Sequence, residues 1–268
     1  MTTRFRMPIL SMFLYCSIII SCSKQSIEPS GTNTAVALNA SPTNVFYGPQ
    51  VNMGDGKARS WISIDRDGTP QEIGIELTDA ALYGLPQDPT DFAAATFVLP
   101  LHIKARQATP FDHLVINWNV HGHEPPGVFD IPHFDFHFYM ITSEEQMSIP
   151  PYEVDPSGFN NLPPHAWWPD AYFPTPGGVP QMGRHWISTS FAPPFTKTLI
   201  YGSYSGKFTF IEPMVTRDLL LAGMSSSTNF NQMHTFVPAN KWYPGTYNVY
   251  KDNATGKHYI TLSNFTWR

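Results

Sequence analysis

The chain has 268 residues, with 16 basic and 21 acidic side chains and a formal net charge of −5 at pH 7. This acidic balance, with no basic run, argues against nucleic acid as a partner. Charged residues make up 14 % of the chain, against about 25 % in typical soluble domains, and aromatic residues also reach 14 %. Because exposing so much uncharged aromatic surface is unfavourable, we expect a homo-oligomer or a buried site for a small-molecule ligand.

The N-terminal segment predicts a lipoprotein signal peptide over residues 1–21. Arg4 and Arg6 form a basic start, and residues 9–20 form an apolar run that is too short to span a bilayer core of about 30 Å comfortably. The sequence Ile19-Ile20-Ser21-Cys22 resembles the lipobox of bacterial lipoproteins. This resemblance implies that Cys22 is acylated, becomes the mature N-terminus and anchors the protein to a membrane.

The mature protein is expected to face the cell envelope. Residues 22–44 are interpreted as the lipidated cysteine and a flexible tether, and residues 45–268 as a single β-rich domain. Ser23 follows the lipidated cysteine where an aspartate would signal retention in the inner membrane. We therefore expect an outer-membrane lipoprotein that faces the periplasm or the cell surface. Cys16 leaves with the signal peptide, so any metal site must use nitrogen and oxygen ligands.

Strand signals dominate the domain and predict an all-β, mainly antiparallel fold, either a sandwich or a jelly-roll-like barrel. The first hairpin joins 59–64 to 71–77 through Asp65-Arg66-Asp67-Gly68. Further strands are predicted at 96–104, 111–123, 133–140, 198–204, 207–211, 247–250 and 258–262. Short helices are predicted at 78–84, at 142–149 with a capping box of Thr142 and Glu145, and at 216–222.

Residues 150–186 combine nine prolines with seven tryptophan, tyrosine and phenylalanine side chains. The prolines remove backbone donors and oppose helix, whereas aromatic residues are rare in disordered segments. An ordered loop that packs over other elements satisfies both conditions. We interpret it as a lid over the mouth of the sheet or barrel.

Two histidine-rich stretches, His121-Gly122-His123 and 133–137, lie ten residues apart. Because residues two apart in a strand share a face, the second stretch places His133, Asp135 and His137 on one side and its phenylalanines on the other. A symmetric hairpin predicts that His123 pairs with His133, His121 with Asp135, and Asn119 with His137. Four imidazoles and a carboxylate would then lie on one patch of sheet, as a metal ion requires.

The leading hypothesis is therefore a site for one transition-metal ion, with Zn, Fe, Mn, Ni and Cu all compatible with nitrogen and oxygen ligands. The predicted ligands are His121, His123 and His137, and the candidates for the remaining positions are His133, Asp135, His185 and Glu212. Glu124, directly after the first motif, is the candidate catalytic acid or base. Asn119, Tyr139 and Trp186 are the candidate pocket residues.

The two histidine runs, together with Met182-Gly183-Arg184-His185-Trp186, Tyr201-Gly202-Ser203-Tyr204 and Ile211-Glu212-Pro213-Met214, resemble a family of secreted bacterial proteins with a domain of unknown function. That family is typified by a Thermus protein controlled by an envelope-stress sigma factor. The resemblance implies a secreted, β-rich and oligomeric domain, and it supplies no activity. A weaker likeness links His121, His123 and His185 to the three histidine roles of the cupins.

Two functions remain open from the sequence. The first is a lipid-anchored envelope protein with a histidine-rich metal site, which could serve a metal-dependent enzyme of unknown substrate. The alternative is a non-catalytic protein of the envelope that binds a ligand or assembles with copies of itself. In that case the imidazoles, which titrate near pH 6.5, would respond to envelope pH.

Overall fold

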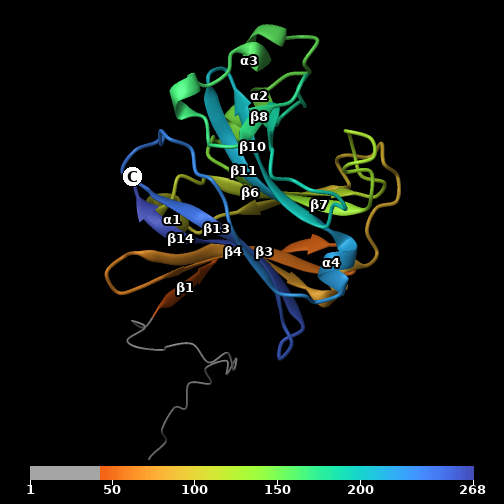
Figure 1. Ribbon diagram of the computed structural model, residues 1–268. Coiled ribbons are helices and arrows are strands. Elements are labelled where there is room, and N and C mark those ends of the chain that lie inside the picture. Colours follow the sequence, from red (N-terminus) through yellow and green to blue (C-terminus); the bar gives the residue numbers. More distant parts are fainter. Residues whose placement is uncertain (1–42) are drawn as a thin grey trace, which may run out of the picture. The chain divides into compact units, whose positions relative to one another are not determined.

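Two seven-stranded antiparallel sheets stack as the layers of a sandwich-like fold (Figure 1). The structure is a computed structural model and describes residues 43–268. The predicted signal peptide, Cys22 and nearly all of the predicted tether lie outside the described residues. Within the described part of the chain, no helix is long and apolar enough to cross a membrane.

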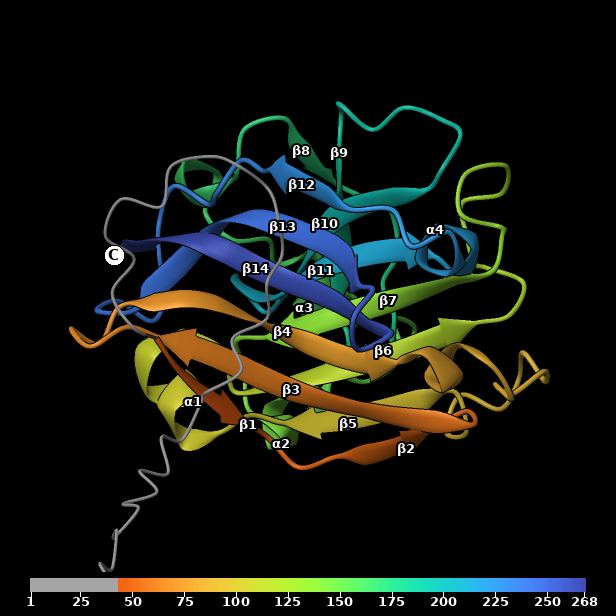
Figure 2. The same cartoon turned by 90° about the horizontal axis from the view of Figure 1, so that it is seen from below.

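The first sheet is built largely from the two ends of the described chain, and Figure 2 shows its strands side by side. Its order is β1 (Asn44–Tyr47), β3 (Gly56–Ile64), β4 (Pro70–Thr78), β14 (Lys257–Trp267), β13 (Trp242–Asp252) and β12 (Ser226–Asn229), with β2 (Val51–Met53) paired to β3. The predicted β3–β4 hairpin is confirmed. Its turn uses Gly68, whose φ of 86° is unfavourable for other residues.

The second sheet carries the 133–137 motif on one of its inner strands, whereas His121 and His123 lie in a loop outside its strands. Its order is β5 (Thr96–Pro100), β6 (His113–Asn119), β7 (His133–Tyr139), β11 (Lys207–Thr216), β10 (Lys197–Tyr204), β9 (Arg184–Ser188) and β8 (Tyr172–Pro174). The turn between β10 and β11 consists of Ser205 and Gly206, with φ of 50° and 82°. Two positive φ values are what a two-residue type I′ hairpin turn requires.

The helices are short and lie between strands. They are η1 (Asp79–Leu82), α1 (Ile103–Ala108), α2 (Ser143–Ser148), α3 (Pro156–Asn160), η2 (His165–Trp167) and α4 (Arg217–Leu221). The predicted capping box of α2 is present, with both reciprocal bonds between Thr142 and Glu145. The predicted strand 96–104 is wrong at its end. There the ring of His102 accepts a bond from the backbone of Lys104 and caps α1 instead.

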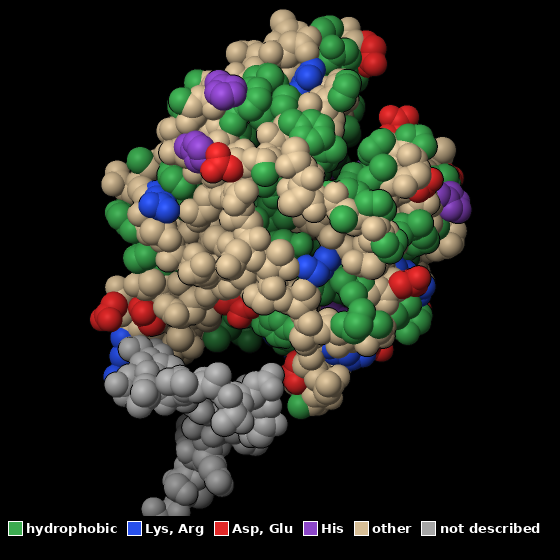
Figure 3. All heavy atoms as spheres, viewed as in Figure 1, with side chains coloured by type: hydrophobic (Ala, Val, Ile, Leu, Met, Phe, Trp, Pro, Cys, Tyr) green, Lys and Arg blue, Asp and Glu red, His purple; other side chains and the backbone are tan. Residues whose placement is uncertain are grey.

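The predicted alternation along the two histidine strands is confirmed. Leu114 and Ile116 of β6, and Phe134, Phe136 and Phe138 of β7, are fully buried in the core between the sheets. The histidines of β7 therefore face away from the first sheet. Apolar and uncharged atoms cover most of the face in Figure 3 and charged side chains are few, in line with the low charge content of the sequence.

The outer face of the second sheet is covered by loops. The segment 150–186 supplies α3, whose Phe159 packs with Tyr139 and Phe210 on that face. Figure 1 shows α3 on the side of the second sheet that lies away from the first. The predicted lid is therefore an ordered segment that covers one face of the second sheet and not the mouth of a barrel. Its β8 and the start of β9 also form the edge of that sheet.

Replacing Phe136 by alanine tests the core that orients the histidine strands. Its side chain is 0 % exposed, so the loss of transfer free energy and the resulting cavity should lower the free energy of unfolding by about 3–5 kcal/mol. Phe92 is 74 % exposed, and Phe92→Ala should leave stability unchanged. Urea denaturation measures both variants. Equal stability of the two would contradict the described packing.

Candidate metal site

The pairing of β6 with β7 differs from the predicted register, which is wrong. In the structure Asn119 pairs with His133, Asn117 with Asp135, and Val115 with His137. The reason is that β6 ends at Asn119, and the residues that follow form a separate loop rather than a continued strand. His121 therefore does not lie opposite Asp135.

Gly122 returns His123 to the sheet by a different route. Its φ is +74°, and a Cβ atom at this position would lie 2.0 Å from the carbonyl oxygen of Phe129. The backbone N–H of His123 donates to that same carbonyl at 3.1 Å. This tight turn folds the loop onto β7, so the ring centroids of His123 and His133 lie 4.8 Å apart.

Three side chains converge beside this turn. Nε2 of His133 lies 3.1 Å from Oδ1 of Asp135, and Nε2 of His123 lies 3.4 Å from Oδ2 of the same carboxylate. One potential ligand atom from each residue lies within 4.8 Å of the other two. The imidazole of His133 is fully buried, whereas that of His123 is 31 % exposed, so the group opens to solvent at His123. These three residues could hold a metal ion.

The hydrogen bonds of both imidazoles leave Nε2 free. Nδ1 of His123 lies 2.8 Å from the carbonyl oxygen of Glu124, and Nδ1 of His133 lies 2.7 Å from that of Ile131. A carbonyl only accepts, so Nδ1 carries the hydrogen in each ring and the neutral ring directs a lone pair from Nε2 toward Asp135. Metal-binding histidines are commonly oriented in this way.

The spacing of the ligand atoms also suits a cation. Two atoms that are each about 2.0–2.1 Å from a tetrahedral ion lie about 3.3 Å apart. Each imidazole lies near this distance from one oxygen of Asp135, His133 from Oδ1 and His123 from Oδ2. Asn119 donates from Nδ2 to Oδ2 of Asp135 at 2.7 Å and fixes the orientation of the carboxylate. Without a cation, the lone pairs and the carboxylate would repel one another at this range.

The close approach of these side chains shifts the pKa values of His123 and Asp135. Burial alone would lower the pKa of His123, but the hydrogen bond and charge of Asp135 raise it to about 9. Burial likewise opposes ionisation of Asp135, yet His133 and His123 hold its pKa well below the ordinary value. The site therefore stabilises one positive charge next to Asp135, which a proton on His123 or a metal ion can supply.

A second buried group adjoins the first along the same face. Nε2 of His137 lies 3.2 Å from Oε2 of Glu212, and the two side chains are 0 % and 1 % exposed. His185 of β9 pairs with Gly202 and packs its ring against Phe210, whose ring also contacts His137. Buried polar atoms of both groups find no hydrogen-bond partner among the described residues: His133 Nε2, Asp135 Oδ1, His137 Nδ1 and Nε2, His185 Nε2 and Glu212 Oε2.

Burial keeps this second group uncharged. It lowers the pKa of His137 to about 4 and that of His185 to about 3, so both rings retain free lone pairs at neutral pH. Burial, reinforced by the charge of Asp135, raises the pKa of Glu212 well above its ordinary value. Since folded proteins pair more than about 90 % of their buried polar groups, such a concentration of unpaired donors and acceptors indicates a functional site.

Of the remaining candidate residues, His121, Glu124 and Trp186 lie apart from these groups, whereas Tyr139 adjoins the second group. His121 and Glu124 are exposed on the loop, and Trp186 faces the core, where its Nε1 donates to Ser203. Tyr139 is buried between the rings of His113 and His137 and stacks on both. The sequence reasoning missed the carbonyl groups that fix the two imidazoles. It also passed over Gly122, although a glycine between two histidines was the available signal for a turn.

Comparison with known proteins adds one similarity. The family model described as TTHB210-like (hypothetical protein TTHB210) matches residues 65–118, from the β3–β4 turn to Trp118 near the end of β6. The match stops before both histidine motifs. No curated protein matches the chain, and no solved structure does. The similarity therefore covers strands that support the candidate site, but none of its proposed ligands, and it indicates no activity.

Replacing Gly122 by alanine tests how His123 reaches the site. Alanine at positive φ costs about 1–2 kcal/mol, and here its Cβ would also collide with the backbone of Phe129. We expect a stability loss beyond the φ penalty and a displaced His123 ring, which NMR of the imidazole resonances would report.

Gly127 provides the matched control. It lies in the same loop with φ of +76°, but nothing lies within 4 Å of the position a Cβ would take. Gly127→Ala should carry only the φ penalty and leave the His123 resonances in place. Identical behaviour of the two variants would disprove the role assigned to Gly122.

Proposed function

We propose that this protein is a metal-binding protein of the bacterial cell envelope, with one transition-metal ion held by His123, His133 and Asp135. The observation that carries the proposal is the fixed orientation of both imidazoles. Each is held through Nδ1 by a backbone carbonyl and presents Nε2 to the same carboxylate. Metal-binding histidines are commonly oriented by such a bond from the other ring nitrogen, whereas packing in an apolar core does not require it.

His137, Glu212 and His185 extend the proposed centre as its buried wall. The charges of Asp135 and His123 act on His137 and on Glu212, which places these groups within electrostatic reach of the three ligands. A cation beside Asp135 would favour release of the proton from Glu212, because opposite charge lowers the pKa of a carboxyl. The wall then offers further nitrogen and oxygen ligands or a site for a transferable proton.

Nitrogen and oxygen ligands suit Zn, Fe, Mn, Ni and Cu alike. Three protein ligands leave a coordination position open, and a bound divalent ion supplies Lewis acidity and lowers the pKa of a coordinated water to about 7. The exposed edge of His123 gives access for a substrate of a hydrolytic or oxygen-using reaction. Glu124, in the same loop, stays a predicted general acid or base.

Metal analysis of protein purified without a histidine tag tests the centre. We expect about one equivalent of a transition metal by mass spectrometry after reconstitution. His133→Ala and Asp135→Asn should each weaken metal binding by more than about 100-fold. Loss of a residue that only hydrogen-bonds to a ligand costs about 10–100-fold in metal affinity, and loss of a ligand itself should cost more. His113→Gln is the matched control, since His113 lies on the same face but is bonded to Gln146 and Asp112.

Thermal unfolding provides a second measurement on the same samples. Metal at about 100 times its dissociation constant should stabilise the native state by about 2.7 kcal/mol, and a chelator should reverse the shift. The His133→Ala protein should show no shift. Binding of less than about 0.2 equivalents by the folded wild type, or equal binding by wild type and Asp135→Asn, would refute the proposal.

The envelope location rests on the sequence pattern that ends at Cys22. Cys22→Ser should move the protein from the membrane fraction to the soluble fraction and abolish incorporation of labelled palmitate, because the serine hydroxyl cannot form the thioether. The matched variant Ser23→Ala should keep both properties. Palmitate labelling of Cys22→Ser would refute lipidation at this residue. The expected homo-oligomer stays a prediction.

A further inference from the structure

A cavity of about 330 Å³ lies beside His121, on residues that contribute nothing to the metal ligands. Its walls come from the segment around η1, the end of β6, the residue before β7 and the first residue of α4. They are Leu82, Tyr83, Gly84, Leu85, Gln87, Trp118, Val120, His121, Pro132 and Arg217. We propose that this cavity binds a small carboxylate with an apolar tail.

The charged end of the cavity is formed by Arg217. Its Nε donates to the carbonyl oxygen of Leu82 at 2.9 Å, and its guanidinium carbon lies 5.4 Å from the centre of the Tyr83 ring. These contacts hold the side chain at the wall. None of the ion pairs formed by the described residues includes Arg217, and no aspartate or glutamate lines the cavity. The remaining guanidinium N–H groups are thus available to an anion.

Apart from Gln87 and His121, the other side chains that line the cavity are mainly apolar. Leu82 is fully buried, and Leu85 and Trp118 are each 6 % exposed. The indole N–H of Trp118 already donates to the carbonyl oxygen of Pro86 at 2.9 Å, so this side chain offers the cavity its ring rather than a donor. Val120 and Pro132 complete a surface that gains from contact with a hydrocarbon chain.

A free guanidinium beside an apolar surface favours a ligand that has both a carboxylate and a hydrocarbon tail. A guanidinium pairs with a carboxylate through two parallel hydrogen bonds, and the exposed ring of His121 can add a third donor. A bare inorganic anion would leave the apolar walls in contact with water, whereas an apolar tail would cover them. The volume lies near the lower end of the range for ligand pockets, about 300–1,000 Å³, which indicates a small molecule.

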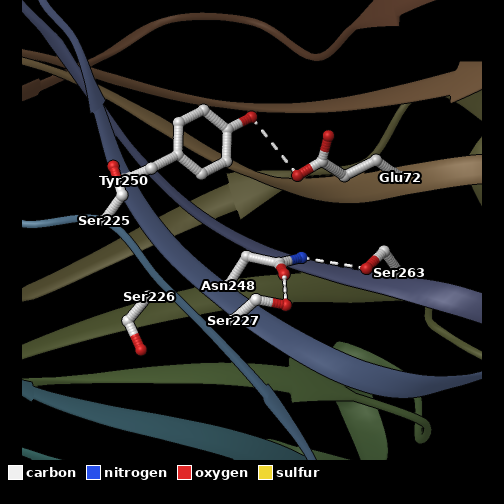
Figure 4. A pocket seen from close by; sticks show the side chains of 7 residues that line it. All are labelled: Glu72, Ser225, Ser226, Ser227, Asn248, Tyr250 and Ser263. Carbon is white, nitrogen blue, oxygen red and sulfur yellow. Dashed lines mark hydrogen bonds between the residues drawn. The ribbon is translucent and has the colours of Figure 1, made fainter. Parts of the chain in front are cut away.

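A second depression, on the outer face of the first sheet, lacks such free groups (Figure 4). There the Tyr250 hydroxyl donates to Glu72 at 3.2 Å, and Asn248 donates to Ser263 at 2.9 Å. Ser227 donates to the amide oxygen of Asn248 at 2.7 Å. Since no lysine or arginine lines this depression and Glu72 adds a carboxyl group there, this surface provides no comparable anion site.

Titration calorimetry with octanoate tests the carboxylate cavity. Wild-type protein should bind one octanoate and should bind 1-octanol at least about tenfold more weakly, since a charged hydrogen-bonded pair favours the carboxylate by that factor or more. Arg217→Gln should reduce octanoate affinity by a similar factor. Arg66→Gln removes the same charge from the exposed β3–β4 turn and should leave the affinity unchanged.

A second variant guards against misfolding of Arg217→Gln. Val120→Phe fills the apolar wall without changing charge and should weaken octanoate and octanol alike, while both variants keep the wild-type circular dichroism spectrum. Chelator-treated protein should bind octanoate as the untreated protein does, so failure of the metal proposal leaves this one intact. Absence of octanoate binding, equal binding of octanol, or full affinity of Arg217→Gln would each overturn it.

Discussion

The candidate metal site depends on a single buried carboxylate. Asp135 lies in β7, an inner strand of the second sheet, where removal from water makes its negative charge costly unless a positive partner is close. Its neighbours are two imidazoles whose Nδ1 hydrogens are already committed to backbone carbonyls. The positive charge must therefore lie on or between the Nε2 atoms, and the local geometry follows from this one requirement.

The sheet supplies the rigid part of the arrangement. His133, Asp135 and His137 occupy alternate positions of one strand, so the core packing of the two phenylalanines between them and of Phe138 after them fixes all three polar side chains at once. Apolar clusters on either side of the polar group, around Phe159 and around Phe195, exclude water from the outer face. This low-dielectric surrounding strengthens every electrostatic interaction at the site.

Much of this could be predicted from the sequence because it depends on local pattern. Alternation of apolar and polar residues specified the strands and the shared face of His133, Asp135 and His137, and the Thr142–Glu145 pair specified a helix start. The register could not be predicted, because it depends on where β6 ends and how the loop returns, which are decided by the contact of Gly122 with Phe129. The position of His121 follows from that same turn, whereas that of Trp186 depends on the pairing of β9 with β10.

The turn at Gly122 also explains why the two histidines of one motif separate. In a continued strand, residues two apart share a face, and both rings would point to one site. A positive φ at the middle residue reverses the chain instead, so His123 returns to Asp135 while His121 stays beside Arg217 and Trp118. One ligand of the proposed centre thus rests on a loop and two on a strand. Since loops open more readily than central strands, access to the centre is governed on the His123 side.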